Sequence, residues 1–211
     1  MAGGDDSFEH LLREVRACTV CATALPLGPR PVVQAAPGAR LLIIGQAPGT
    51  RVHESGLAWS DPSGERLRDW TGIDPATFYD PARIALMPMG FCYPGRNPGG
   101  GDAPPRPECA RMWHAPIRAH LPAIRLTLLV GQYARKAYLP GRATLTDAVR
   151  EFAAAPSGFF PLPHPSWRSI GWMRRNPWFE AEVLPALRAR VALALETGRR
   201  NFSHQDAKTP S

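Results

Sequence analysis

Short apolar runs alternate along this chain with segments of helical pattern, and Gly or Pro ends most of the pieces. Runs that are apolar at nearly every residue are typical of strands buried on both faces of a sheet. Strands separated by helices pair in parallel, with helices on both faces. The alternation therefore predicts an α/β fold with three αβα layers and a central four-stranded parallel sheet. The predicted strands are residues 40–44, 84–87, 126–130 and 159–162.

Helical patterns fill the intervals between the strands. We predict helices over residues 8–16, 63–70, 108–121, 132–138, 144–152 and 177–195. A chain of 211 residues, of which 44% are apolar, suits one globular domain. We expect that domain to span residues 1–196, with a Cys-bearing helix over 7–24 at its start and a polar tail over 197–211 after it.

Chemistry is expected where the parallel strands end, because ligands of such sheets bind outside the carboxyl ends of the strands. The segments at these ends are 45–49 (GQAPG), 88–95 (PMGFCYPG), 131–133 (GQY) and 163–166 (PHPS). Residues 93–107 form a long loop that holds five Pro and four Gly. Long loops are uncommon in a compact domain unless they are tied down or functional.

The chain is basic, with a formal net charge of +7 and a sequence pI of about 9.8. Nearly all of its basic residues are Arg, whose planar guanidinium binds two phosphate oxygens at once, so the charge favours a polyanionic partner. No apolar run is long enough to span a membrane, and residues 1–7 lack the pattern of a signal peptide. We therefore expect a cytoplasmic protein.

Four cysteines fall into two groups. Cys18 and Cys21 form a C-x2-C pair, and Cys92 and Cys109 are separated by sixteen residues. A C-x2-C pair presents two thiolates to one metal, and disulfides are rare in the cytoplasm. The spacing leaves three interpretations open: four reduced thiols, a structural zinc, or an iron–sulphur cluster.

Two strand-end segments resemble motifs of the uracil-DNA glycosylase superfamily. Residues 45–49 (Gly-Gln-Ala-Pro-Gly) resemble its first motif, and residues 164–166 (His-Pro-Ser) resemble the motif after its last strand. The match extends furthest toward the iron–sulphur (family 4) glycosylases. Their first motif continues with residues that stand here as Gly56, Trp59, Ser63 and Gly64, and their four Cys are spaced as in this chain. The resemblance therefore favours a 4Fe-4S cluster, with structural zinc as the alternative.

The resemblance implies roles for individual residues. A base flipped out of DNA would lie against Trp59 and the first motif, and His164 would donate a hydrogen bond to it as the glycosidic bond breaks. The base-binding residues of the first motif would be Gln46, Ala47, Pro48 and Gly49. The DNA-binding residues would be Ser63, Ser166, Trp167 and Arg168. We expect Arg51, Arg96, Arg106 and Arg168 at the active edge.

Two positions depart from the family pattern. His53 stands where family 4 enzymes usually carry an acidic residue that positions water, and Pro88 stands where they carry an Asn that reads uracil. His53 either acts as the water-positioning catalytic base or caps a turn. Glu54 and Asp61 are the other acidic candidates.

Four further aromatic side chains fit structural roles. Trp70 and Trp113 have the helical spacing of core residues, and His114 and His120 are expected at the surface or as caps.

The resemblance implies a monofunctional DNA glycosylase that hydrolyses a damaged, deaminated base from DNA in base excision repair. Its partner would be DNA that contains the damaged base, and we expect a monomer. No Lys accompanies the motifs, which disfavours a Schiff-base lyase. Two alternatives stay open: a nucleic-acid-binding member of the same fold whose catalysis is weakened or lost, and an enzyme that hydrolyses free nucleosides.

Overall fold

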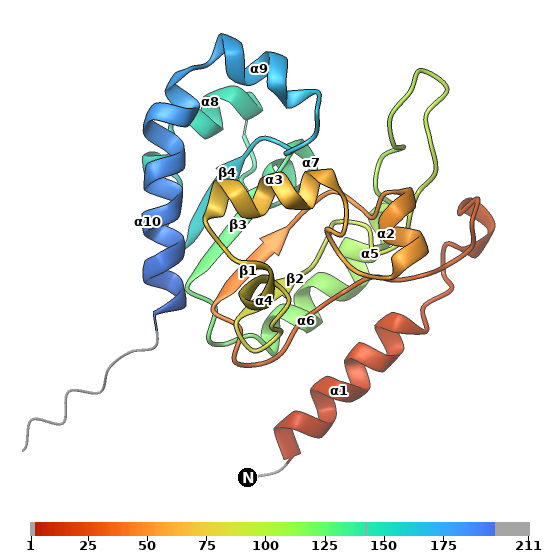
Figure 1. The fold of residues 1–211 in the computed structure, drawn as a ribbon. Coiled ribbons are helices and arrows are strands. Elements are labelled where there is room, and N and C mark those ends of the chain that lie inside the picture. Colours follow the sequence, from red (N-terminus) through yellow and green to blue (C-terminus); the bar gives the residue numbers. More distant parts are fainter. Residues whose placement is uncertain (1–2, 142, 197–211) are drawn as a thin grey trace, which may run out of the picture.

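The computed structural model describes residues 3–141 and 143–196, so the predicted polar tail over 197–211 lies outside the described residues. Its sheet contains β1 (Leu41–Ile44), β2 (Ile84–Leu86), β3 (Leu126–Val130) and β4 (Phe159–Leu162). All neighbouring strands are parallel, in the spatial order β2-β1-β3-β4. Helices lie on both sides of this sheet (Figure 1). The predicted α/β fold with a four-stranded parallel sheet is confirmed.

Helices connect the strands and extend beyond them. They are α1 (Gly3–Arg16), α2 (Thr50–Ser55), α3 (Pro62–Thr71), α4 (Pro75–Phe78), α5 (Pro107–Cys109), α6 (Ala115–Ala119), α7 (Gln132–Tyr138), α8 (Leu145–Arg150), α9 (Ser169–Arg175) and α10 (Leu184–Leu195). Two π-helical stretches, Ala110–His114 and Phe179–Val183, interrupt the helices predicted over 108–121 and 177–195. Within the described part of the chain, no helix has the length and apolar character needed to cross a membrane.

The prediction of a Cys-bearing helix over 7–24 is wrong. The first helix ends at Arg16, and both cysteines of the C-x2-C pair lie in the turns that follow it. The amide of Cys18 donates to the carbonyl of Val15 at 3.2 Å, which is a tighter turn than an α-helix makes. The chain therefore leaves the helix just before the pair.

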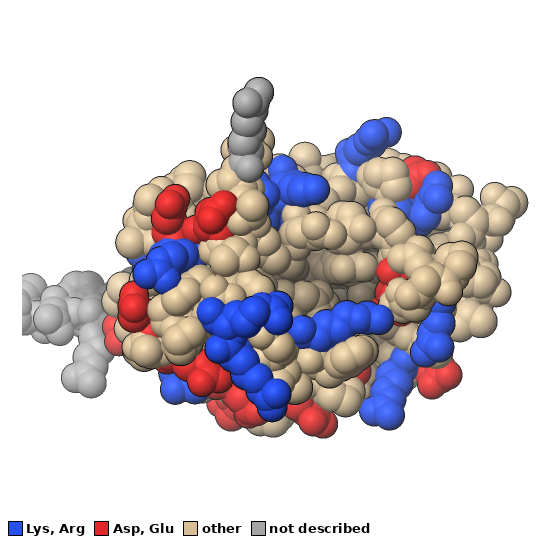
Figure 2. All heavy atoms as spheres, turned by 90° about the horizontal axis from the view of Figure 1, so that it is seen from above, with Lys and Arg blue, Asp and Glu red and all other residues tan. Residues whose placement is uncertain are grey.

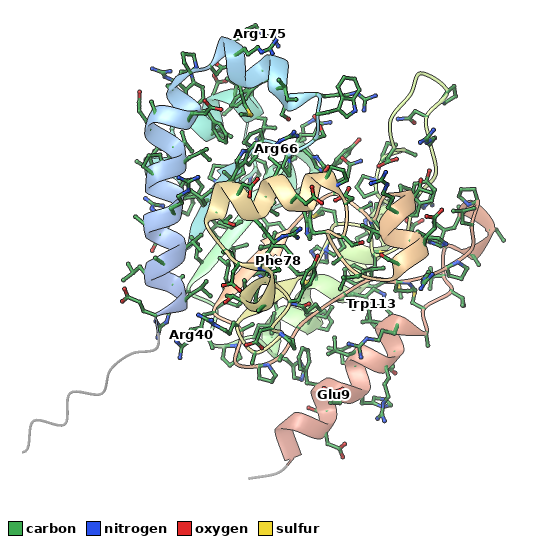
Figure 3. The ribbon with its side chains drawn as sticks, viewed as in Figure 1. Glu9, Arg40, Arg66, Phe78, Trp113 and Arg175 are labelled. Atoms are coloured by element: carbon green, nitrogen blue, oxygen red, sulfur yellow. The ribbon has the colours of Figure 1, made fainter. Side chains whose placement is uncertain are left out.

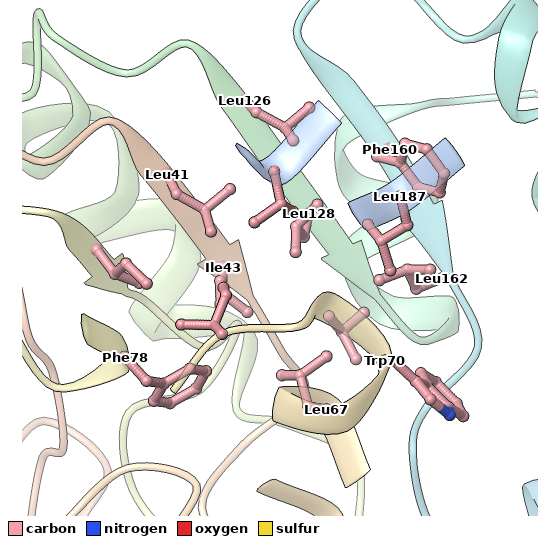
Figure 4. Packing of buried hydrophobic residues seen from close by; sticks show 14 of the residues in the cluster. Leu41, Ile43, Leu67, Trp70, Phe78, Leu126, Leu128, Phe160, Leu162 and Leu187 are labelled. Carbon is pink, nitrogen blue, oxygen red and sulfur yellow. The ribbon is translucent and has the colours of Figure 1, made fainter. Parts of the chain in front are cut away.

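Side chains of the strands alternate between two hydrophobic cores. On β1, Leu41 and Ile43 belong to the core beneath α3, α4, α8 and α10, whereas Leu42 and Ile44 belong to the core beneath α1, α6 and α7. Figure 4 shows the first core, with Leu67 of α3 facing β1. The sheet is thus covered on both faces, which leaves the ends of its strands as the place for a site.

Three of the four aromatic predictions are confirmed in these cores and at their edge, and one of the three is Trp113, which is partly buried against the second core. Trp70 is only 4% exposed and meets Phe179 edge-on at a ring distance of 5.0 Å. His120 is the C-cap residue of α6, and its Nδ1 lies 3.0 Å from the carbonyl oxygen of Pro116.

His114 contradicts the prediction of a surface or capping role. Only 5% of it is exposed. Its two ring nitrogens lie 2.7 Å from the Tyr138 hydroxyl and 3.0 Å from the Pro88 carbonyl oxygen, and its ring stacks on Phe91. His114 is the last residue of the π-helical stretch Ala110–His114, and its side chain is buried. His114 thereby anchors the segment that follows β2.

Folding stability should depend on this histidine in mild acid. Burial lowers the pKa of His114 to about 4, below the value of about 6.5 in an unfolded chain. The unfolded state therefore binds the proton first, and stability falls as pH drops from about 6.5 toward 4, by about 3 kcal/mol in total. Urea unfolding at several pH values measures this slope. A His114→Gln variant should show a smaller slope, because only the second buried histidine, His164, would still contribute, and equal slopes in both proteins would refute the assignment.

Candidate functional site

A cavity of about 370 Å³ opens at the carboxyl ends of the strands. Figure 2 looks onto this end of the molecule and shows a hollow with Lys and Arg side chains beside it. Three of the four predicted strand-end segments contribute lining residues, and residues 131–133 do not. The lining residues are Val32, Ala47, Pro48, Gly49, Val52, Ala58, Trp59, Asp61, Ser63, Pro88, Arg96, Gly101, Asp102, His164, Ser166, Trp167 and Arg168.

Most of the residues predicted for the site meet in this cavity. From the first motif and its continuation come Ala47, Pro48, Gly49, Trp59 and Ser63, and from the loop after β4 come His164, Ser166, Trp167 and Arg168. Gln46 and His53 are not among the lining residues. Segments more than one hundred residues apart in the chain are thus brought to one place by the parallel sheet.

Trp59 lines the cavity and is fixed there by its backbone conformation and by its neighbours. Its backbone has φ 57°, a left-handed conformation that is uncommon for any residue except Gly. Its carbonyl oxygen accepts hydrogen bonds from Arg68 and Tyr79, each at 3.2 Å. A Cβ atom added at Gly45 would lie 2.7 Å from the indole ring, so the ring lies directly against that glycine. These contacts fix the aromatic face in one orientation.

Gly64 is the second glycine that this tryptophan requires. A Cβ atom at Gly64 would lie 1.8 Å from the Trp59 carbonyl oxygen. We expect Gly64→Ala to destabilise the fold by about 3 kcal/mol, because either α3 or Trp59 must move. Thermal and urea unfolding measure the loss.

Gly171 provides the control for that substitution. It is also helical, but a Cβ atom there would meet only Arg175 at 3.7 Å, an ordinary contact. Gly171→Ala should therefore be neutral or stabilising. A Gly64→Ala protein as stable as Gly171→Ala would show that Trp59 is not held as described.

His164 lies beside this ring in the cavity lining. The two ring centroids are 5.9 Å apart. The loop that carries His164 is fixed by neighbours: Ser169 donates its hydroxyl to the His164 carbonyl, and Arg66 of α3, labelled in Figure 3, donates to the Pro165 carbonyl at 3.0 Å. Burial lowers the pKa of His164, and the charge of Asp61 opposes that shift. The imidazole is therefore neutral near pH 7 and can still donate one N–H.

His53 and Gln46 have other surroundings. His53 lies on α2, with its ring 6.1 Å from that of Tyr93. Its Nδ1 is buried and has no hydrogen-bond partner among the described residues. The side-chain amide of Gln46 donates to the carbonyl of Ala103 at 3.3 Å. The first motif is thus tied to the long loop that follows β2.

That loop folds into a small hairpin over residues 95–103. Arg96 and Asp102 face each other as an antiparallel bridge, and the backbone of Ala103 donates to Gly95 at 2.8 Å. The turn uses Gly100 and Gly101, whose φ angles of 86° and 83° suit glycine. In Figure 1 the hairpin extends away from the sheet between β2 and α5. It brings both Arg96 and Asp102 to the cavity.

Of the four arginines predicted at the active edge, Arg96 and Arg168 line the cavity. Arg51 is exposed on α2, and Arg106 borders the cysteines instead. The interpretation of Arg106 as an active-edge residue is therefore wrong, because the hairpin separates the cavity from the end of the loop. Sequence reasoning also missed Asp102, which follows three consecutive glycines and carries no motif of its own.

The four cysteines meet at a second, small cavity. Cys18, Cys21, Cys92 and Cys109 all line it. Burial raises the pKa of the Cys92 thiol to about 11, and charge on each of the other three cysteines acts in the same direction. Within residues 3–141 and 143–196, no group of three or more His, Cys, Asp or Glu side chains has the arrangement of a metal-ion site.

The surroundings of the thiols fit a sulfur-rich group. Trp113 and Arg106 also line the cavity, and Trp113 Nε1 and Arg106 Nε are buried without a hydrogen-bond partner among the described residues. Leu25 and Phe91 supply apolar walls. Cluster sulfurs and thiolates accept hydrogen bonds from N–H groups, and such bonds tune the cluster. Four thiols with two unused N–H donors therefore match the donor chemistry of an iron–sulphur cluster.

Comparison with known protein families identifies a match over most of the chain. The family model described as the uracil DNA glycosylase superfamily matches residues 32–188. That range contains all four strands, the first motif, the hairpin and the loop that carries His164, and it begins after Cys18 and Cys21. A match over this much of the chain, together with the parallel sheet and the strand-end cavity, shows that the chain belongs to the uracil DNA glycosylase superfamily.

Proposed function

We propose that this protein is a monofunctional DNA glycosylase, which flips a damaged base out of DNA and hydrolyses its glycosidic bond. The observation that carries the proposal is that Trp59 and His164 lie side by side in the cavity lining. Trp59 supplies a flat apolar face, and His164 supplies a neutral N–H donor. A flipped base needs both: a surface on which to stack and a donor for the charge that it gains.

The rim of the cavity suits the backbone of DNA. Trp167 is 69% exposed, and the guanidinium of Arg168 lies 5.0 Å from the centre of its ring. An exposed indole beside a cation would fill the gap that the extruded base leaves and would bind a flanking phosphate. Ser63 and Ser166, which also line the cavity, would donate hydroxyl groups to phosphate oxygens.

Bond cleavage would use His164 as an electrophile. As the C1′–N bond breaks, its electron pair moves onto the base, and negative charge grows on a base carbonyl oxygen. The neutral imidazole would donate its N–H to that oxygen. Because the loop is already fixed by Ser169 and Arg66, the donor needs little reorganisation during the reaction.

The base itself is proposed to be a deaminated one. The position at which family 4 enzymes carry the uracil-reading Asn is Pro88, and Pro88 lines the cavity. Proline offers no side-chain amide, so recognition of the base edge would fall to the backbone of Ala47 to Gly49 and to His164. Uracil, hypoxanthine and xanthine all present carbonyl oxygens and ring N–H groups to such partners.

We also propose that Cys18, Cys21, Cys92 and Cys109 bind a 4Fe-4S cluster. The cysteine spacing resembles the iron–sulphur glycosylases, and the four thiols share one cavity with two unused N–H donors. The bound cluster would supply a covalent link between the segment after α1 and the loop before α5. A brown protein with iron and sulfide in a ratio near one supports it, and zinc alone by elemental analysis would refute it.

The activity is tested by base release from DNA. Oligonucleotides that contain uracil, hypoxanthine or xanthine, single- or double-stranded, are incubated with the folded protein, and abasic sites are cleaved with alkali and counted. We expect release from at least one substrate. Release from free nucleosides but not from DNA would instead identify a nucleoside hydrolase.

A further inference from the structure

The cavity contains a carboxylate that the family motifs do not supply. We infer that Asp102, carried by the hairpin, is the residue that positions and deprotonates the attacking water. The inference rests on the proposed glycosylase activity and adds the residue that serves the other half of the reaction. His164 stabilises the leaving base, and hydrolysis also requires a water activated on the sugar.

Asp102 lies directly against the first motif. Its Oδ2 is 3.6 Å from the position that a Cβ atom would take at Gly49. The side-chain amide of Gln46 holds the next residue, Ala103, by its carbonyl. The backbone carbonyl of Asp102 itself accepts from the side chain of Asn97 at 3.1 Å. These contacts place the carboxylate above the turn that would hold the base.

The hairpin also meets the loop after β4. A Cβ atom at Gly101 would lie 2.8 Å from an Nη atom of Arg168, so the guanidinium touches the hairpin one residue before Asp102. The hairpin and the loop after β4 therefore contact each other, and both contribute residues to the cavity lining.

The carboxylate of Asp102 is free to act on water. Among the residues that the structure describes, it accepts no hydrogen bond and forms no ion pair. Burial raises its pKa, and the charge of Asp61 adds to that effect, whereas Arg96 and Arg168 oppose it. Although the residue is exposed, its raised pKa makes its carboxylate a stronger base than an unperturbed one.

The other candidates for the water-activating residue are less suitable. Asp61 lines the same cavity, but its Oδ1 accepts from the backbone amide of Gly64 at 2.9 Å as the N-cap of α3. His53 and Glu54 do not line the cavity. Asp102 is thus the lining carboxylate without a structural hydrogen bond.

The step balances in atoms and electrons. Water adds its oxygen to C1′ of the deoxyribose while the C1′–N bond breaks, and the electron pair of that bond leaves with the base. The proton lost by the water passes to the Asp102 carboxylate and then to solvent. The departing base, held by the N–H of His164, takes a proton from solvent. The products are the free base and an abasic site.

Single-turnover base release tests the inference, using the lesion that the wild-type protein cleaves. Asp102→Asn keeps the shape of the side chain and the hairpin backbone, so its melting temperature and DNA affinity should match the wild type. Its rate should fall about 100-fold. The wild-type rate should also fall in acid, as Asp102 becomes protonated, and the rate of the variant should not show that acid limb.

Asp74→Asn is the matched control. Asp74 caps α4 away from the cavity, and Asn caps helices equally well. A full rate in this variant with a slow rate in Asp102→Asn supports the inference. An Asp102→Asn rate within threefold of the wild type overturns it while the glycosylase proposal stands. A wild-type protein that releases no base overturns both.

Discussion

His164→Ala should reduce base release by about 100- to 1,000-fold at saturating enzyme. The substitution removes the N–H that would stabilise charge on the departing base, and nothing else in the cavity replaces it at that position. DNA affinity should change little, because the contacts to phosphates come from the rim at Trp167 and Arg168. Single-turnover rates and fluorescence anisotropy with the same oligonucleotide separate the two effects.

His120→Ala is the control for this prediction. His120 ends α6 and stacks on Phe8, and it is not part of the cavity lining. It should keep the wild-type rate. Because burial keeps His164 neutral, the wild-type rate should also not rise as pH falls through 6. An unchanged rate in His164→Ala would remove this residue from the catalytic mechanism.

The second large effect is expected at the cysteines. If the proposed cluster is present, Cys92→Ser should lose its visible absorption and lower the stability of the protein by several kcal/mol, since the cluster would join two segments far apart in the chain. Base release by whatever folded protein remains should be close to normal, because the cysteine cavity and the cavity at the strand ends share no lining residue. Iron content, absorption near 400 nm and thermal unfolding measure the loss.

Cys18→Ser decides between a cluster and free thiols. Cys92 is 7% exposed, so a serine there costs some stability even without a metal, whereas Cys18 is half-buried in a turn and would tolerate serine well. If all four bind one cluster, both variants lose iron and stability together. A stable Cys18→Ser protein with wild-type metal content would contradict the cluster.

The strands of the sheet and several helices could be predicted because the sequence patterns that indicate them lie within the elements themselves. The bounds of β3, α7 and β4 match the prediction, since Gly131 separates a continuous apolar run from a helical pattern. Helices α2, α4 and α9 were not predicted. The Asp74-Pro75 start of α4 is a capping signal that would have found it.

The candidate site also contains residues that could be predicted from local motifs and residues that could not. His164, Trp59 and Gly49 could be predicted because each belongs to a motif at a strand end, and parallel strands end at one edge. Asp102 could not, because its position depends on how the hairpin over 95–103 folds back onto the first motif. His53 holds the sequence position of a catalytic residue, but α2 places its ring beside Tyr93, outside the cavity lining.

The most direct test of the central claim is base release by the purified, folded wild-type protein from oligonucleotides that contain single deaminated bases. We expect free base and an alkali-labile abasic site from at least one of them, with the activity lost in His164→Ala. Tight, salt-sensitive DNA binding without release of any base would contradict it and would identify a DNA-binding protein that has kept the fold without the reaction.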